Sequence, residues 1–131
     1  MIKIFKMLED PESDKDELNA RIQWFIYGDA WKKEGWVFNK KFSPPRITKI
    51  YQMKPKPDNY TTSLDAAMSI GAEELSEWDI YINQYGDSGK FFRCILSRYG
   101  PRKSVTAQYI PDMPRAICHA RLQALDRVRG S

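Results

Sequence analysis

Few residues in this sequence could take part in covalent chemistry. The chain has one histidine, His119, and two cysteines, Cys94 and Cys118, which are not in a CxxC spacing. A serine or cysteine nucleophile that relies on a histidine base would have to use His119, and a tetrahedral zinc site needs more Cys and His ligands than the chain holds. We therefore expect a surface histidine, no enzyme activity, no metal and no cofactor. We expect the cysteines to be free and buried, although a disulfide between them stays open.

Other sources of catalytic chemistry are weak. The sequence contains neither GxxxxGK[ST] nor GxGxxG, so the glycine-rich phosphate loops are missing. The carboxylates Glu73, Glu74 and Glu77 could form an acid and base pair or hold a metal ion. Closely spaced acids are also typical of the solvated end of a helix, which is the interpretation we adopt.

The best functional signal is a mixture of aromatic rings and cations between residues 29 and 59. Flat rings can stack on a nucleobase, and Lys or Arg side chains can meet phosphates. Because tryptophans in small domains usually fill the core, a packing role is the alternative. The mixture consists of Trp31, Trp36, Phe38, Lys40, Lys41, Phe42, Arg46 and Tyr51. From it we take Trp36, Lys40, Lys41 and Arg46 as candidate ligand-binding residues.

The positive charge is unevenly distributed along the chain. The formal net charge is +4, and residues 32–56 contain eight basic side chains against one acid, Glu34. A second basic group, Arg98, Arg102 and Lys103, surrounds a predicted turn, and arginine suits bidentate recognition of phosphate. Such segregation permits an anionic partner, so these three residues are further candidate ligand-binding residues. A solvated surface with uneven charge is the alternative.

Hydrophobic spacing predicts helices at both ends of the chain and in its middle. The first begins after Pro11 with Ser13 as N-cap, and ends at Gly28. A second starts at Thr62 or Ser63, with a small-residue face suited to lying on a sheet. The last is capped by Asp112 and has Pro114 in its first turn, and its polar side carries Arg115, His119, Gln123 and Asp126.

Strands are predicted between the last two helices. Residues 78–83, 92–97 and 105–109 alternate apolar and polar side chains and are separated by glycine-rich turns, which indicates an antiparallel meander. Val105, Ala107 and Tyr109 are expected to form the third strand. Residues 29–59 are interpreted as two short strands or a loop with strand-like pieces, because Pro44 and Pro45 interrupt any ladder.

The order of these features resembles that of a known family. The matching segments are Asp16-Glu17-Leu18-Asn19-Ala20-Arg21-Ile22, Tyr60-Thr61-Thr62-Ser63-Leu64-Asp65-Ala66-Ala67, Trp78 with the meander, and Pro114-Arg115-Ala116-Ile117-Cys118-His119-Ala120-Arg121-Leu122-Gln123-Ala124-Leu125. Together they resemble the phage ABA sandwich domain family. The resemblance implies a sheet between helices and a phage or prophage origin, and it implies no activity.

The sequence therefore predicts a single domain over residues 1–131, with a basic aromatic segment at about 29–59. The predicted fold is α+β, an antiparallel β-meander with helices on both faces as a three-layer sandwich. No apolar run reaches the roughly 20 residues of a membrane helix, and the N-terminus lacks the features of a secretion signal. We expect a cytoplasmic location and no membrane partner.

The expected function is that of a phage-encoded accessory protein that binds an anionic, nucleotide-type ligand without chemistry. Sequestration of a host immune signalling nucleotide, an anti-defence role, would suit such a protein. The alternative is a phage structural or assembly component, or a module that contacts nucleic acid or a host protein. A homo-oligomer is also expected.

Overall fold

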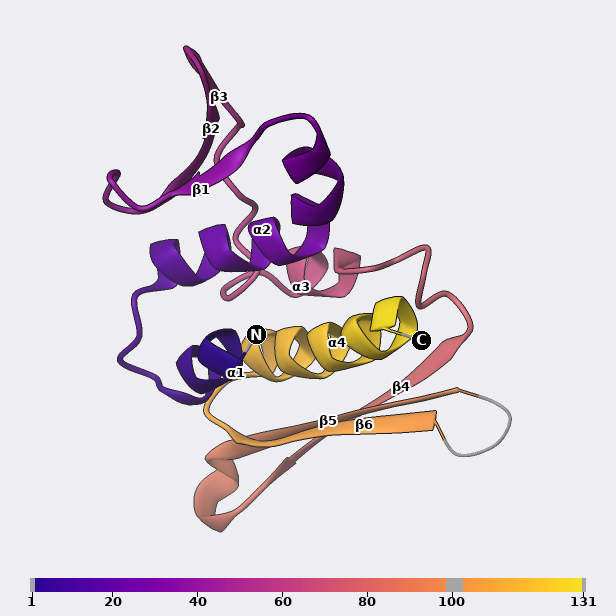
Figure 1. The fold of residues 1–131 in the computed structure, drawn as a ribbon. Helices are drawn as coiled ribbons and strands as arrows, with labels where there is room; N and C mark the ends of the chain where they lie inside the picture. The colour runs from indigo at the N-terminus through magenta and orange to yellow at the C-terminus, as the bar shows by residue number, and fades with distance from the viewer. Residues whose placement is uncertain (1, 99–102, 131) are drawn as a thin grey trace.

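The computed structural model describes residues 2–98 and 103–130, and it confirms an α+β fold (Figure 1). The helices are α1 (Ile2–Glu9), α2 (Lys15–Lys33), α3 (Leu64–Ser69) and α4 (Met113–Gly130). The strands are β1 (Val37–Asn39), β2 (Arg46–Lys49), β3 (Gln52–Met53), β4 (Trp78–Tyr85), β5 (Phe91–Arg98) and β6 (Lys103–Ile110). These strands form two antiparallel three-stranded sheets, in the orders β1-β2-β3 and β4-β5-β6.

The larger sheet, β4-β5-β6, is the meander that the alternating pattern predicts. Strands β4 and β5 pair over their full length, and alternate side chains such as Cys94 and Leu96 enter the core. The ladder between β5 and β6 shifts register between Phe92 and Cys94, which places an extra residue in β6. Tyr109 adopts φ 60° in this bulge and is 64% exposed, while Ile110 is buried. Val105, Ala107 and Tyr109 lie in β6 as predicted, and the bulge leaves the Tyr109 ring outside the core.

The helices lie on one side of the larger sheet and not on both. Figure 1 shows α1 and α4 next to the sheet, α2 and α3 beyond them, and the smaller sheet, β1-β2-β3, outermost beyond α2. The outer face of the larger sheet exposes Tyr81 as well as Tyr109. The expectation of a sheet between two helical layers is thus not met by the described part of this chain.

The N-terminal region contains a helix that the sequence analysis missed, and its second helix is longer than predicted. Helix α1 buries Ile4 and Leu8 in the core. Helix α2 is capped by Asp14, whose carboxylate accepts hydrogen bonds from two backbone amides, and not by Ser13. It continues past Gly28 to Lys33, and Gly28 lies against the Trp24 ring, where a Cβ atom would come within 3.1 Å of Cδ2.

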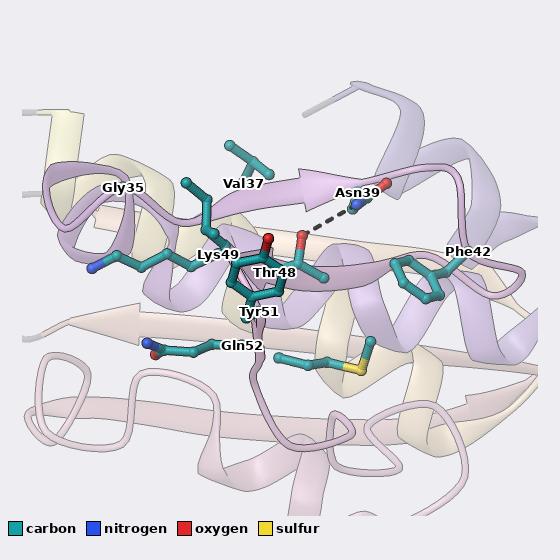
Figure 2. A pocket seen from close by; sticks show the side chains of 10 residues that line it. Gly35, Val37, Asn39, Phe42, Thr48, Lys49, Tyr51 and Gln52 are labelled. Carbon is teal, nitrogen blue, oxygen red and sulfur yellow. Dashed lines mark hydrogen bonds between the residues drawn. The ribbon is translucent and has the colours of Figure 1, made fainter.

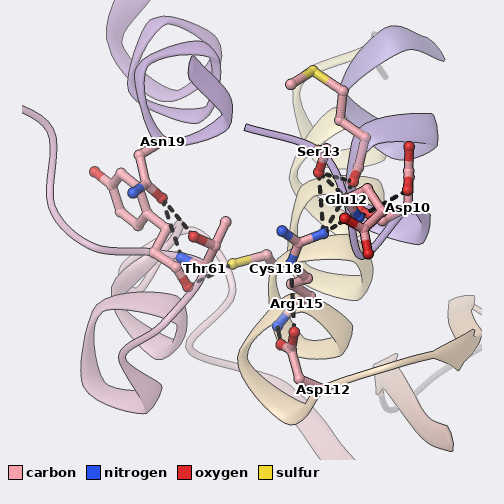
Figure 3. A network of polar contacts seen from close by, with 10 residues as sticks. Asp10, Glu12, Ser13, Asn19, Thr61, Asp112, Arg115 and Cys118 are labelled. Carbon is pink, nitrogen blue, oxygen red and sulfur yellow. Dashed lines mark hydrogen bonds and ion pairs between the residues drawn. The ribbon is translucent and has the colours of Figure 1, made fainter. Parts of the chain in front are cut away.

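Helix α4 begins at the predicted cap, since Asp112 accepts a hydrogen bond from the Arg115 amide. The position of Arg115 on a polar side is wrong, because its side chain is only 1% exposed. Its Nη1 donates to the carbonyl oxygens of Met7 and Asp10 at 3.2 and 2.6 Å, and to the Ser13 hydroxyl (Figure 3). Arg115 thereby ties the end of α1 to α4, which the sequence pattern of α4 alone cannot reveal.

The middle of the chain follows its predictions in part. Ser63 caps α3 as expected, but α3 packs against α4, and Leu64 and Met68 stay partly exposed. Residues 29–59 hold the last turn of α2 and three short strands, one more than predicted. In the smaller sheet, Phe38 and Ile47 pair in register, and Ile47 is buried. This segment brings most of the candidate residues together on one side of the molecule.

Candidate functional site

The candidate ligand-binding residues fall into two groups that the structure does not bring together. Trp36, Lys40, Lys41 and Arg46 belong to or flank the first two strands of the smaller sheet. Arg98 and Lys103 lie opposite one another at the end of the β5–β6 ladder, in the larger sheet, and Arg102 lies outside the described residues. Figure 1 places the two sheets on opposite sides of the helices. One shared anion pocket is therefore not formed by these two groups.

In the second group, Arg98 has a partner within the chain. Its Nη2 donates to Glu77 Oε2 at 3.1 Å, and both side chains are well exposed. Exposed ion pairs contribute little to stability. The three acids Glu73, Glu74 and Glu77 lie in the turns after α3 and not at the end of a helix, and two of them form ion pairs, Glu77 with Arg98 and Glu74 with Arg129.

The first group contains one aromatic ring that is not available for stacking. Trp36 is only 8% exposed. The Lys54 ammonium lies 4.4 Å from its ring centroid and 4.6 Å from that of Trp31, and the Lys49 ammonium lies 6.0 Å from the Trp36 ring. The protein's own cations thus take the positions over these indoles.

Arg46 is the candidate residue that lines a cavity. The cavity has a volume of about 260 Å³ and lies between the loop after β1, the chain before α3 and the first turns of α2. Its lining consists of Asp16, Asn19, Phe42, Ser43, Pro44, Pro45, Arg46, Lys56, Pro57 and Asn59. We call it the proline cavity. Lys40 and Lys41 are exposed on the turn beside it and are not among its lining residues.

The guanidinium of Arg46 is only partly satisfied. Its Nη2 donates to the Lys54 carbonyl oxygen at 2.9 Å, whereas its Nε–H is buried and has no hydrogen-bond partner. Buried donors without a partner are rare in native proteins, because each costs the free energy of its lost hydration. Arg46 is also one of the residues that line the proline cavity.

The other lining residues offer complementary chemistry. Lys56 adds a second cation, and Asp16 is the acidic side chain in the described lining. Asn19 Oδ1 already accepts two hydrogen bonds from Thr61, so Asn19 can offer a ligand its amide NH2 group. Phe42 is partly exposed and presents a flat ring. Two cations, amide groups and one ring can together hold a molecule that combines an anionic part with a flat polar part.

The surface position predicted for His119 is wrong. Its side chain is 13% exposed and lies 4.7 Å, between ring centroids, from Phe5. The Gln123 amide lies 2.8 Å from His119 Nδ1, and Glu9 Oε2 lies 3.4 Å from Nε2. Burial lowers the pKa of His119 despite the opposing effect of Glu9. Packing against α1 explains the burial, since the helical wheel of α4 carries no information about α1.

The cysteines are free and buried, as predicted. Burial raises the pKa of the Cys94 thiol to about 12 and raises that of Cys118 further. The thiolate is the reactive form of cysteine, so these thiols are inert at neutral pH. Within residues 2–98 and 103–130, we find no group of His, Cys, Asp and Glu side chains placed to hold a metal ion, and no helix long and apolar enough to cross a bilayer.

Sequence reasoning missed most of the proline cavity. It found Arg46 and included Phe42 in the basic aromatic segment, but it gave no binding role to Lys56, Asn19 or Asn59. One signal was present: two proline-containing stretches, 43–46 and 55–57, each carry a basic residue. The sequence does not show that both stretches lie against α2, because tertiary packing determines this arrangement.

The resemblance to the phage ABA sandwich family stays a prediction. No family model matches the sequence, and comparisons with curated proteins and with solved structures also give no match.

Proposed function

We propose that this protein binds a small anionic, nucleotide-type ligand in the proline cavity and performs no chemistry on it. The buried, unpaired Nε–H of Arg46 carries the proposal. A protein gains nothing from such a donor in the free state, since the missing partner costs about 1–3 kcal/mol. A ligand phosphate would supply the partner in a charge-assisted hydrogen bond.

The size and lining of the cavity select the class of ligand. Its volume of about 260 Å³ is slightly below the roughly 300–1,000 Å³ of typical small-molecule sites. This favours a mononucleotide over a larger dinucleotide. Arg46 and Lys56 would bind the phosphate, Phe42 would contact the base, and Asn19 would hydrogen-bond to a base or sugar acceptor.

Sequestration fits this site better than turnover. The described lining contains carboxylate, amide, proline and cationic side chains, and neither the histidine nor either cysteine of the chain is among them. A protein that only holds a nucleotide removes it from its receptors. We propose this as the role of a phage accessory protein acting in the host cytoplasm against nucleotide-based immune signalling.

A thermal-shift screen with calorimetric follow-up tests the proposal. A ligand that binds only the folded state raises its melting temperature, so we expect a rise with nucleoside monophosphates or cyclic mononucleotides. Smaller rises in melting temperature are expected with the matching nucleoside or with inorganic phosphate, because each can make only part of the contacts in the cavity.

Two variants locate the site. Lys56→Gln should strongly reduce the nucleotide-induced shift, whereas Lys40→Ala combined with Lys41→Ala should retain it, since both lysines are on the exposed turn. If only the double variant loses the nucleotide-induced rise in melting temperature, the ligand binds at that turn and not in the proline cavity. If no nucleotide changes the melting temperature of the parent protein, nucleotide binding is rejected.

A further inference from the structure

The outer face of the smaller sheet carries apolar side chains that no described element covers (Figure 2). These side chains surround an open hollow of about 610 Å³. The hollow is lined by Gly35, Val37, Asn39, Phe42, Thr48, Lys49, Ile50, Tyr51, Gln52 and Met53. We call this surface the outer groove. An exposed apolar surface with a polar border is typical of an interaction site.

The turn between β2 and β3 shows that this exposure is unusual. Lys49 and Gln52 pair across it, so Ile50 and Tyr51 are the central residues of a two-residue hairpin loop. Such positions normally hold Gly, Asn or Asp. Here Ile50 is 80% exposed, and Tyr51 is fully exposed with φ 60°, a value that costs a tyrosine free energy. Local folding explains neither residue, whereas a contact with a partner would explain both.

The charges around the outer groove define the partner. Lys49 lines the groove, and Lys40 and Lys41 are exposed on the turn that follows β1. Within residues 32–56, the sequence has the single acid Glu34. A partner that fits this surface therefore needs apolar side chains for the hollow and negative charge for its border.

We propose that the outer groove binds a segment of a partner protein that combines acidic and apolar side chains. A concave surface favours a protein segment over a bilayer, because a peptide side chain can fill the hollow. Asn39, Thr48 and Gln52 provide hydrogen-bonding groups that a peptide backbone can use. Nucleic acid is disfavoured, because the lining of the hollow is mainly apolar.

The direct test measures the binding of three short, fluorescently labelled peptides by anisotropy. The first alternates Leu or Phe with Glu, the second replaces Glu with Lys, and the third keeps Glu but replaces Leu and Phe with Ser. We expect binding of the first peptide alone, weakened at high ionic strength because part of the attraction is between charges. Equal binding of the second peptide, or no binding of the first, would overturn the proposal.

Variants locate the contact on the outer groove. Ile50→Ser combined with Tyr51→Ser should weaken binding of the acidic amphipathic peptide by at least about tenfold, because a large apolar contact is lost. Tyr81→Ser is the matched control, since Tyr81 is an exposed ring on the larger sheet, and it should bind normally. An unchanged affinity in the double variant would place the contact elsewhere and reject the groove.

Two further probes separate the partner classes. Phosphatidylglycerol-containing vesicles and a single-stranded oligonucleotide are each tested with the parent protein and the Ile50 and Tyr51 double variant. If either probe binds through these two residues and the acidic peptide does not, the proposal is overturned in favour of that class. Lys56→Gln should leave peptide binding intact, so failure of the nucleotide site and failure of the outer groove can be told apart.

Discussion

Replacing Arg46 with lysine should abolish most ligand binding while leaving the stability of the free protein almost unchanged. Lysine keeps the positive charge but removes the Nε–H donor that is buried without a partner. The variant therefore distinguishes the contribution of the Nε–H donor to ligand binding from the contribution of the positive charge. No other described side chain of the proline cavity offers so direct a comparison.

The effect on the free protein is the balance of two opposing changes. Losing the 2.9 Å hydrogen bond from Arg46 Nη2 to the Lys54 carbonyl oxygen costs about 1–3 kcal/mol. Removing an unsatisfied buried donor returns about 1–3 kcal/mol. We therefore expect the free energy of unfolding to change by less than about 1 kcal/mol, measured by chemical denaturation.

The effect on binding is not balanced in this way. A charge-assisted hydrogen bond between the guanidinium and a phosphate contributes about 1.5–3 kcal/mol, so the dissociation constant should rise about tenfold to a hundredfold. A nucleotide present at about a hundred times its dissociation constant stabilises the parent protein by about 2.7 kcal/mol, but a hundredfold weaker variant by only about 0.4 kcal/mol. At roughly 4 °C per kcal/mol, the shift in melting temperature falls from about 10 °C to about 2 °C.

Two results would refute this reasoning. A loss of several kcal/mol in the ligand-free Arg46→Lys variant would show that Arg46 is held by contacts that the fold needs. An undiminished melting shift with nucleotide would show that the Nε–H donor does not meet the ligand. Lys33→Gln removes an exposed cation at the end of α2, and this matched control should behave like the parent protein in both assays.

Three further predictions concern stability. Arg115→Met should lower the free energy of unfolding by about 1–3 kcal/mol, because the loss of three hydrogen bonds to α1 and its following turn outweighs the removal of the buried, unpaired Nη2 donor; a change near zero in denaturant titration would contradict this. Burial lowers the pKa of His119 below 6.5, so on acidification the imidazole is protonated in the unfolded chain before it is protonated in the folded protein. The free energy of unfolding should therefore fall below that pH by at most about 1.4 kcal/mol per pH unit. His119→Gln should flatten this dependence of stability on pH, and an identical slope in the variant would argue against the lowered pKa of His119. Gly71→Ala should cost about 1–2 kcal/mol, since Gly71 has φ 61° and a Cβ there would lie 3.0 Å from Leu125 Cδ1; Gly130→Ala, with no atom within 4 Å of its Cβ, is the control, and equal melting temperatures would refute the expected strain.

The meander and α4 could be predicted because their signals are local. Alternation with period two marks β4 and β5, and Asp112 with Pro114 marks the start of α4. The errors arise where a distant segment decides the outcome. Arg115 is polar in composition but is buried by the end of α1, and His119 is covered by Phe5 of the same helix.

The candidate site shows the same division. A basic aromatic segment is readable from composition, and Arg46 was found in this way. Composition cannot tell an exposed ring from a buried one, so it favoured Trp36, which is packed under Lys54, over Phe42, which lines the cavity. Whether a cation is free or already paired is likewise decided by partners distant in sequence, as Arg98 and Glu77 show.

The placement of both proposed sites on one segment has a structural reason. Among the described residues, the main hydrophobic cluster draws on α1, α2, α3 and its following turns, the larger sheet and α4, but on no residue between Ile26 and Tyr60. The smaller sheet instead rests on α2 from outside, through contacts such as Phe38 near Trp24. Changes in this segment therefore disturb little of the core that keeps the protein folded.

This separation predicts the behaviour of a deletion. Replacing residues 37–54 with a flexible Gly/Ser linker should leave a cooperatively folded helix and sheet core, because the main cluster keeps all its members. Both nucleotide and acidic-peptide binding should disappear, since Arg46, Phe42 and the outer groove are removed. Circular dichroism and thermal melting check the first outcome, and the two binding assays check the second. A deletion variant without a cooperative transition would show that the smaller sheet belongs to the folding unit, whereas a folded variant that still binds nucleotide would exclude the proline cavity as the site.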